Sequence, residues 1–188
     1  MILSDRSIKK EIEKGSISLN PFNPTDIQPS SIDVHLDKSF LIFNKAQHSL
    51  IDVKKKTDDL MKEVIITEEQ PFILHPGEFV LGSTLESVKL SASISARIEG
   101  KSSLGRIGLL IHSTAGFVDA GWEGKLTLEL SNVSPLPITL YYNMKIGQIS
   151  FMQLSSPVER PYGSEALGSK YQNQEKPEAS KFYKNFKQ

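Results

Sequence analysis

The sequence predicts a mainly β fold, such as a β-sandwich, a jelly roll or a distorted barrel, with one short N-terminal helix and few other helical turns. Helical periodicity is scarce after residue 15, and short runs with strand-like alternation recur along the chain. Glycine and proline turns separate these runs, as in all-β architectures. With 188 residues and 38% hydrophobic content, the chain is long enough to bury one domain core.

A single helix is expected near the N-terminus, at about residues 5–14. Ser4 and the acidic residue after it are typical of a helix N-cap and first turn. Ile8 and Ile12 are spaced i, i+4, so both would fall on one face of a helix. Gly15 stands where a helix C-cap belongs.

Several later segments alternate apolar and polar residues as strands do. Ile32, Val34 and Leu36 share one face of SSIDVHLDKSFLIF. A strand, a Pro-Gly turn and a second strand are predicted for FILHPGEFVLGSTLESVKL, and another strand for ISARIEG. Three more short strands are predicted within GKLTLELSNVSPLPITLYYNMKIGQISFMQL, with breaks at Pro135 and Asn143.

Two stretches depart from this pattern. Residues 51–70 are charged and irregular, so we expect an exposed insertion with at most one helical turn. From residue 155 the chain is polar, yet it keeps five aromatic residues, namely Tyr162, Tyr171, Phe182, Tyr183 and Phe186. We therefore divide the chain into a β domain, residues 1–154, and a C-terminal segment, residues 155–188. This segment is either a partly disordered tail or becomes ordered against a ligand, a neighbouring subunit or its own core.

Composition and charge exclude several classes of protein. Lys+Arg and Asp+Glu number 22 each, so there is no general basic field to attract nucleic acid. The absence of cysteine excludes disulfides, iron–sulfur clusters and thiolate zinc sites, and no two histidines have the spacing of a helical metal site. The N-terminus interleaves acids and bases and resembles neither a signal peptide nor a membrane anchor, so a cytoplasmic location is expected.

A local anion site is one interpretation of KSSLGR, residues 101–106. The hydroxyls and backbone N–H groups of Ser102 and Ser103 suit phosphate, as does the guanidinium of Arg106. A nucleotide-hydrolase phosphate loop would need another glycine upstream of Gly100, but a strand-like segment stands there. A polar β-turn with a surface arginine fits the spacing equally well.

Glu129 is the acidic residue of the apolar segment GKLTLEL. Leu126, Leu128 and Leu130 would take one face of this strand, and Thr127 and Glu129 the other. Carboxylates generally face solvent, whereas a carboxylate that lines a pocket could move protons near neutral pH. The sequence pattern leaves both interpretations open.

Asp119 lies between glycines in STAGFVDAGWEG. It is either a structural turn residue or a functional carboxylate that accepts a ligand hydroxyl or orients a water molecule. In the functional interpretation, Gly116 and Gly121 would let the backbone come close to a ligand.

Together these stretches resemble the dCTP deaminases of the dUTPase-like superfamily. The resemblance covers nearly the whole chain and rests on LSDRSIKKEI, QPSSIDVHL, HPGEFVLGSTLE, EGKSSLGRIGLLIHSTAGFVDAGWEGKLTLELSN, PITLYYNMKIGQISFMQL and PYGSEALGSKYQNQ. It implies a distorted jelly roll or β-barrel of the dUTPase-like type. The chain departs from the family pattern at His35, where arginine is common, and at Ala120, where proline is common.

The segment HSTAGFVDAGW is most similar to the bifunctional, dUMP-forming branch, because monofunctional deaminases tend to carry a bulkier residue where Gly116 stands. AGFVDAGWEG, GKSSLGR and KIGQIS also resemble dUTPase motifs, but the tail around Lys170 and Gln174 is of the deaminase type. The implied reaction converts dCTP and two waters to dUMP, diphosphate and ammonia, on the way to dTTP. The alternatives are a monofunctional dCTP deaminase that releases dUTP, a dUTPase without deaminase activity, and a non-catalytic nucleotide-sensing module.

The resemblance also implies a role for each catalytic residue. Glu129 would take a proton from water, the hydroxide would attack C4 of cytosine, and the carboxyl would deliver protons to the leaving ammonia. Ser102 and Arg106 would assist at this water, and the backbone about Ala115 would position it. Asp119 would contact the deoxyribose 3′-hydroxyl and orient the water of the second step.

Contacts to the triphosphate, the sugar and the pyrimidine are implied for a larger set of residues: Lys101, Ser102, Ser103, Leu104, Gly105, Arg106, Ala115, Gly116, Asp119, Thr127, Leu128, Glu129, Gln148, Tyr162, Lys170 and Gln174. The C-terminal segment would close over this site. Mg²⁺ would bind through the triphosphate rather than in a protein cage, and no zinc is expected. The superfamily assembles as trimers with active sites between subunits, so we expect a homotrimer, with dCTP as substrate and dTTP as a possible inhibitor.

Overall fold

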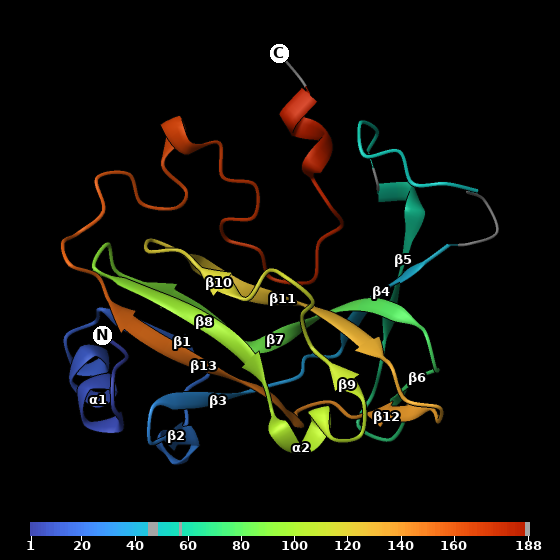
Figure 1. Cartoon of the computed structure of the whole chain (residues 1–188), viewed down its shortest axis with the longest axis horizontal. Coiled ribbons are helices and arrows are strands. Elements are labelled where there is room, and N and C mark those ends of the chain that lie inside the picture. The colour runs from blue at the N-terminus through green and yellow to red at the C-terminus, as the bar shows by residue number, and fades with distance from the viewer. Residues whose placement is uncertain (45–48, 57, 187–188) are drawn as a thin grey trace.

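The computed structural model describes residues 1–44, 49–56 and 58–186. In these residues antiparallel strands dominate, which confirms the predicted mainly β class (Figure 1). The six-stranded sheet runs in the order β5 (Met61–Ile65), β4 (Ser39–Phe43), β7 (Phe79–Leu90), β11 (Glu123–Asn132) and β9 (Leu109–Leu110), with β1 (Ile17–Asn20) also paired to β7. The five-stranded sheet runs in the order β10 (Phe117–Val118), β8 (Ile94–Gly100), β13 (Lys145–Gln153), β3 (Ser31–His35) and β2 (Ile27–Gln28). A two-stranded sheet joins β12 (Ile138–Leu140) to β6 (Phe72–Leu74).

The predicted N-terminal helix is confirmed as α1 (Asp5–Glu13). Ile8 is fully buried on its inner face. Gly15 ends the helix with φ at +75°, and its N–H donates to the carbonyl of Ile12, as a glycine C-cap does. Ser4 occupies the N-cap position, but its side chain makes no capping hydrogen bond.

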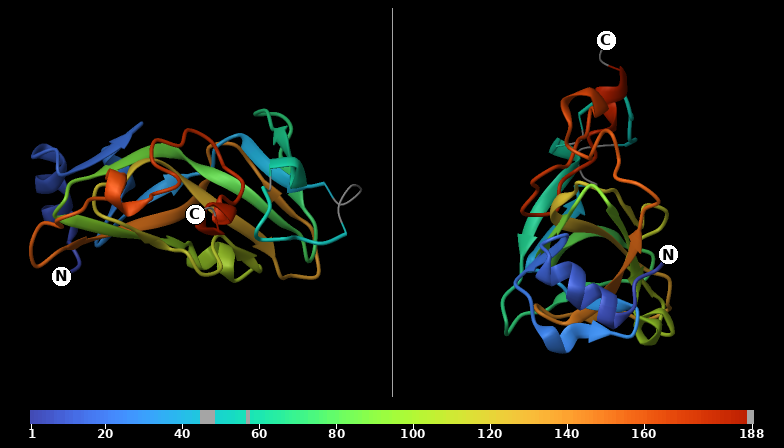
Figure 2. Two further views of the ribbon diagram at one scale, coloured as in Figure 1. Left: turned by 90° about the horizontal axis from the view of Figure 1, so that it is seen from above. Right: turned by 90° about the vertical axis from the view of Figure 1, so that its left-hand side faces the viewer.

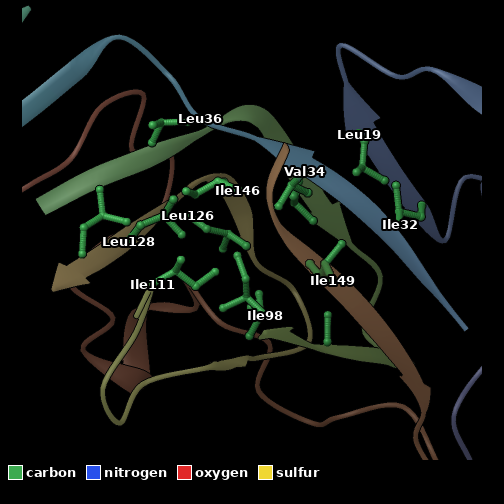
Figure 3. Packing of buried hydrophobic residues seen from close by; sticks show 14 of the residues in the cluster. Leu19, Ile32, Val34, Leu36, Ile98, Ile111, Leu126, Leu128, Ile146 and Ile149 are labelled. Atoms are coloured by element: carbon green, nitrogen blue, oxygen red, sulfur yellow. The ribbon is translucent and has the colours of Figure 1, made fainter. Parts of the chain in front are cut away.

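The core lies between the facing surfaces of the two larger sheets (Figures 2 and 3). Leu128 and Leu130 of β11 are 0% exposed, as their predicted alternation requires. From the other sheet, Ile149 pairs with Ile32 on one side and with Ile98 on the other, and all three are buried. Burying each such side chain contributes about 1.5–3 kcal/mol. Because strand residues alternate, the polar residues between the β11 leucines face away from this core.

Residues 51–70 are more regular than the sequence predicted. The expected helical turn is present as η2 (Asp58–Leu60), but β5 follows it as the edge strand beside β4. Lys62 and Glu63 are exposed on β5, while Leu60 and Ile66 at its ends are buried. Charged residues are common on edge strands. The prediction of an irregular insertion is therefore wrong at β5.

Two further short helical elements follow β8 and precede β2. KSSLGR forms one turn of helix, α2 (Ser102–Gly105), directly after β8, and Arg106 is exposed at its end. A 3-10 turn, η1 (Pro24–Asp26), precedes β2 and begins at an Asn23 cap. The side chain of Asn23 accepts a hydrogen bond from the N–H of Thr25.

Residues 155–186 contain two 3-10 turns, η3 (Glu165–Leu167) and η4 (Phe182–Phe186), and run across one side of the β domain (Figure 1). The N–H of Tyr162 donates to the Ala120 carbonyl at 2.8 Å, and the N–H of Asn173 donates to the Glu123 carbonyl at 2.8 Å. Tyr183 is buried at 8% exposure. The described part of this segment thus packs on its own β domain. Among the described residues, no helix is long and apolar enough to cross a membrane.

Candidate active site

A cavity of about 500 Å³ lies where the C-terminal segment passes over β10 and β11. Six of the residues expected to bind substrate line it: Ala115, Asp119, Thr127, Glu129, Tyr162 and Gln174. Its remaining lining is largely apolar and includes Phe43, Leu60, Met61, Phe79, Phe117 and Trp122. Because such walls exclude water, the few polar groups among them interact more strongly than they would in solvent.

Glu129 faces this cavity from the middle of β11. The core leucines on either side of it fix its direction, since neighbouring side chains on a strand point to opposite faces. Its carboxylate accepts a hydrogen bond from the N–H of Ser113 at 3.0 Å. The chain between β9 and β10 is thereby tied to the carboxylate. Of the two interpretations left open by the sequence, the one in which Glu129 lines a pocket is confirmed.

Asp119 combines a turn position with a place in the cavity wall. Its carbonyl accepts a hydrogen bond from the N–H of Trp122, which closes the turn into β11. Its side chain also lines the cavity. The nearby Gly121 has φ at +90°, and a Cβ there would lie 2.5 Å from Pro161. Gly121 is therefore required for close contact with the C-terminal segment.

Gly116 lies buried behind the cavity wall. Its carbonyl accepts a hydrogen bond from the N–H of Ile98 at 2.8 Å. A Cβ at this position would lie 2.9 Å from the Ile98 carbonyl oxygen and 3.1 Å from Cε1 of His112. Any side chain here would therefore push the loop away from β8 or displace the imidazole.

His112 is a cavity residue that the sequence did not point to. Its Nε2 lies 3.3 Å from Oε2 of Glu99, and its Nδ1 is buried without a partner among the described residues. Burial opposes ionisation of Glu99, but the side chains of Arg97 and His112 hold its pKa below the usual value. No spacing rule could have found this contact, because it depends on β8 and the following loop lying side by side.

The C-terminal segment supplies the other wall. Gln174 is 5% exposed, and its Nε2 donates to the Lys125 carbonyl at 2.6 Å and to Thr127 Oγ1 at 3.0 Å. Its Oε1 is buried and has no partner in the described chain. The rings of Tyr162 and Trp122 lie 5.2 Å apart, and burial raises the pKa of the Tyr162 hydroxyl. This wall holds one buried acceptor that a ligand donor could satisfy.

The remaining expected residues do not line the cavity. Residues 101–106 lie on and around α2, which Figures 1 and 2 show on the opposite side of the β domain from the C-terminal segment. Gln148 is on β13 in the five-stranded sheet. The side chain of Leu128 is in the core, so it can offer only backbone groups. Lys170 is half-buried, and its carbonyl accepts a hydrogen bond from Lys181 Nζ.

Comparison with known proteins agrees with this arrangement. Residues 2–154 match a family model described as dCTP deaminase-like. The chain belongs to the dCTP deaminase-like family. The resemblance seen in its sequence motifs is thereby confirmed.

Full-length relatives make the assignment more specific. This dCTP deaminase-like chain is 58% identical over 187 residues to a protein of Corynebacterium kroppenstedtii named dCTP deaminase, dUMP-forming, with 100% of both chains covered. A protein of the same name from Rhodococcus jostii is 55% identical over 188 residues, again with 100% of both chains covered. The structure is similar to 2′-deoxycytidine 5′-triphosphate deaminase from Agrobacterium tumefaciens, with a TM-score of 0.62 and 25% identity. That match covers 80% of this chain and 46% of the Agrobacterium chain, so this chain spans less than half of it.

Both residues that depart from the family pattern make contacts within the chain. His35, which stands where arginine is common, places Nδ1 2.7 Å from Oε1 of Glu86, and its backbone N–H donates to Oε2 of the same side chain. The Glu86 carboxylate therefore accepts the backbone N–H of His35. Ala120 is 5% exposed, and its carbonyl holds the C-terminal segment through Tyr162.

Proposed function

We propose that this protein converts dCTP and two waters to dUMP, diphosphate and ammonia. The observation that carries the proposal is the Glu129 carboxylate, which faces a largely apolar cavity that also contains Asp119 and Thr127. The full-length relatives named dCTP deaminase, dUMP-forming, support the same reaction. The limited space around Gly116 supports a reaction that ends in dUMP and not in dUTP.

In the first step, Glu129 removes a proton from a water molecule as that water adds to C4 of cytosine. The new C4–O bond gives a tetrahedral centre as the carboxyl passes this proton to N3. The carboxylate then takes the proton of the C4 hydroxyl, so that C4=O forms, and delivers it to the amino nitrogen. The C4–N bond breaks, ammonia leaves and a uracil ring remains. The bond from the Ser113 N–H to Glu129 keeps one carboxylate oxygen in place and leaves the other for the water. The backbone of Thr127 and Leu128 beside it would read the edge of the pyrimidine.

In the second step, another water adds to the α-phosphorus while the bond to the diphosphate breaks. Asp119 lies in the cavity wall where its carboxylate can meet the 3′-hydroxyl of the deoxyribose and orient this second water. The small Gly116 keeps the loop close to β8, which leaves room for the water beside the sugar. Gln174 and Tyr162, with Lys170 nearby, would hold the nucleotide from the C-terminal segment as it closes over the site.

The site also needs the cations of α2, and we propose that a second copy of the chain provides them. Ser102, Ser103 and Arg106 are exposed on α2, and no described residue pairs with the Arg106 guanidinium. Exposed apolar residues surround this helix: Ile107 at 52%, Leu110 at 41%, Val133 at 68% and Leu136 at 70%. We infer that this patch packs against a neighbour in a homotrimer, so that each site combines the cavity of one chain with the α2 segment and Gln148 of another.

We further propose that Mg²⁺ accompanies the nucleotide. In the described part of the chain, no three His, Cys, Asp or Glu side chains are close enough to hold a metal ion, so the triphosphate oxygens are the natural ligands. Bound there, Mg²⁺ would neutralise part of the phosphate charge. Because dTTP shares the deoxyribose and triphosphate of the substrate, we expect it to compete with dCTP for the same site.

The role of Glu129 is tested with Glu129→Gln, which keeps the shape of the side chain but cannot take a proton. We expect kcat for dCTP to fall by about 10²–10⁴-fold, the usual effect of losing a general acid/base. The melting temperature and the KM for dCTP should change little. Chromatography of the products gives the rates of ammonia, dUTP and dUMP formation. A variant with near wild-type turnover would rule out Glu129 as the proton-transfer group.

A further inference from the structure

The ammonium group of Lys101 is held by a buried carboxylate. Its Nζ lies 2.6 Å from Oδ1 of Asp33, whose side chain is 4% exposed, while that of Lys101 is 26% exposed. Asp33 comes from β3 and is 68 positions away in the sequence. The first residue of the KSSLGR segment is therefore anchored to the five-stranded sheet before any ligand is present.

Asp33 is itself fixed in orientation. Its other oxygen, Oδ2, lies 3.2 Å from Nζ of Lys145 and 3.4 Å from Nε2 of Gln28. Lys145 also pairs with Asp26 at 2.8 Å, and these two carboxylates, Asp26 first, raise the pKa of the Lys145 ammonium. Lys145 and Gln28 thus hold Oδ2, and the other oxygen of Asp33, Oδ1, faces Lys101.

The strand register places Asp33 among the residues expected to bind phosphate. Asp33 is directly opposite Gln148 of β13, and Gln148 is directly opposite Glu99 of β8. Residues opposite each other in a sheet share a face. Their neighbours Ile32 and Ile149 are buried in the core, so Asp33 and Gln148 lie on the outer face. Lys101 reaches the same face from the end of β8.

We propose that Asp33 is a positioning residue for the triphosphate, acting through Lys101. The proposal rests on the function proposed above, in which residues 101–106 bind the phosphates. A free lysine side chain has many rotamers, and fixing it on binding costs affinity. Asp33 fixes the Lys101 side chain before the ligand binds. It accepts one N–H donor of the ammonium group and leaves the remaining N–H donors of Lys101 for phosphate oxygens.

A purely electrostatic role for Asp33 predicts an effect of opposite sign. A carboxylate beside a polyanion repels it, so removing the negative charge would strengthen triphosphate binding and lower KM. Removing a positioning residue would instead release Lys101 and raise KM. The direction of the change in KM therefore distinguishes the two roles.

The test compares Asp33→Asn with Lys101→Ala and with the double variant, using dCTP and Mg²⁺. We expect Asp33→Asn to raise KM about tenfold with kcat within about twofold of wild type, since the group does not touch the reacting atoms. In the Lys101→Ala background, the same change should have little further effect on KM, because residues that act as a unit are not additive.

Asp37→Asn is the matched control. Asp37 is a buried carboxylate that pairs with Lys125 at the same 2.6 Å, but it does not contact α2. Both asparagine variants should lower the melting temperature, and only Asp33→Asn should raise KM. An unchanged or lowered KM in a folded Asp33→Asn, or full additivity with Lys101→Ala, would overturn the positioning role. Wild-type protein that makes no uracil nucleotide from dCTP would instead overturn the proposed function itself.

Discussion

At the scale of single residues, little space surrounds position 116. The loop that carries Gly116 lies against the β8 backbone, and the same loop donates the Ser113 N–H to Glu129. A displacement of this loop would therefore disturb the hydrogen bond that holds the proposed catalytic carboxylate. It would also move Ala115, whose side chain lines the cavity.

Gly116→Ala should alter the balance between the two reaction steps. A Cβ would lie 2.9 Å from the Ile98 carbonyl oxygen, a backbone atom that cannot turn aside. The loop must then shift. We expect this shift to displace the water of the second step more than the water of the first step. Chromatography of the products from dCTP should show a larger share of dUTP.

Gly100→Ala serves as the control for this variant. A Cβ at position 100 meets only Cγ1 of Ile111, at an ordinary 3.6 Å. The control should form dUMP as wild type does. If Gly116→Ala also forms dUMP alone, at the wild-type rate, then the space at Gly116 does not govern the second step.

Sequence reasoning named candidate residues for the site but could not predict their surroundings. The alternation of β11 predicted that Glu129 would face away from the leucines, and the structure confirms it. Whether that face meets solvent or a cavity depends on where the C-terminal segment lies, which no local pattern encodes. The contacts of His112 with Glu99 and of Lys101 with Asp33 join separate elements and could not be predicted either.

At the scale of elements, the candidate site is a cavity at the junction between β11 and the C-terminal segment. The Gln174 side chain donates to the Lys125 carbonyl and to Thr127 Oγ1 of β11, and so joins the two elements. No described residue donates a hydrogen bond to its buried Oε1. We infer that the nucleotide completes the junction.

Gln174→Ala should weaken substrate binding more than it weakens the fold. The change removes hydrogen bonds worth about 0.5–1.5 kcal/mol each. It also removes the buried acceptor proposed for the ligand, so KM for dCTP should rise about tenfold, with a smaller change in kcat. Steady-state kinetics and thermal melting measure both effects.

Gln172→Ala is the comparison for the same segment. Gln172 also bonds to the β domain, through its Nε2 to the Gly121 carbonyl at 3.0 Å, but it does not line the cavity. It should lower the melting temperature by a similar amount with KM nearly unchanged. Equal effects of both variants on KM would mean that Gln174 acts only by holding the segment in place.

The elements predicted correctly are those whose signals are local. The α1 helix has its apolar spacing and its glycine C-cap in the sequence, and β12 and β13 are bounded by turn residues. The edge strand β5 was not predicted, because its exposed Lys62 and Glu63 conceal the alternation. Its partner is β4, and an edge strand is recognised from its neighbour rather than from itself.

At the scale of the whole molecule, one chain holds two separated parts of the expected site. The cavity contains Glu129 and Asp119, and the α2 segment with Arg106 lies on the other side of the β domain. In a ring of three copies, one heterologous contact repeated three times would bring the cavity of each chain to the α2 segment of the next. The family resemblance led us to expect a trimer, and the exposed apolar residues beside α2 suggest the face that meets the neighbouring chain.

Mixed trimers of two inactive variants test this arrangement. Glu129→Gln and Arg106→Ala carry different affinity tags, are co-expressed, and are purified through both tags in turn. If each site takes Glu129 from one chain and Arg106 from the next, every mixed trimer keeps one intact site. Activity should then return to about one third of wild type. If both residues come from the same chain, the mixture should stay inactive.

An isotope-trapping experiment is the most direct test of whether dCTP is converted to dUMP without release of dUTP. Radiolabelled dCTP is turned over with Mg²⁺ in the presence of excess unlabelled dUTP, and quenched samples are separated by anion-exchange chromatography. We expect the label in dUMP from the earliest time points and almost none in dUTP, because both steps occur before the nucleotide leaves the cavity. Label that accumulates in the dUTP pool would contradict a coupled site and would indicate a deaminase that releases dUTP.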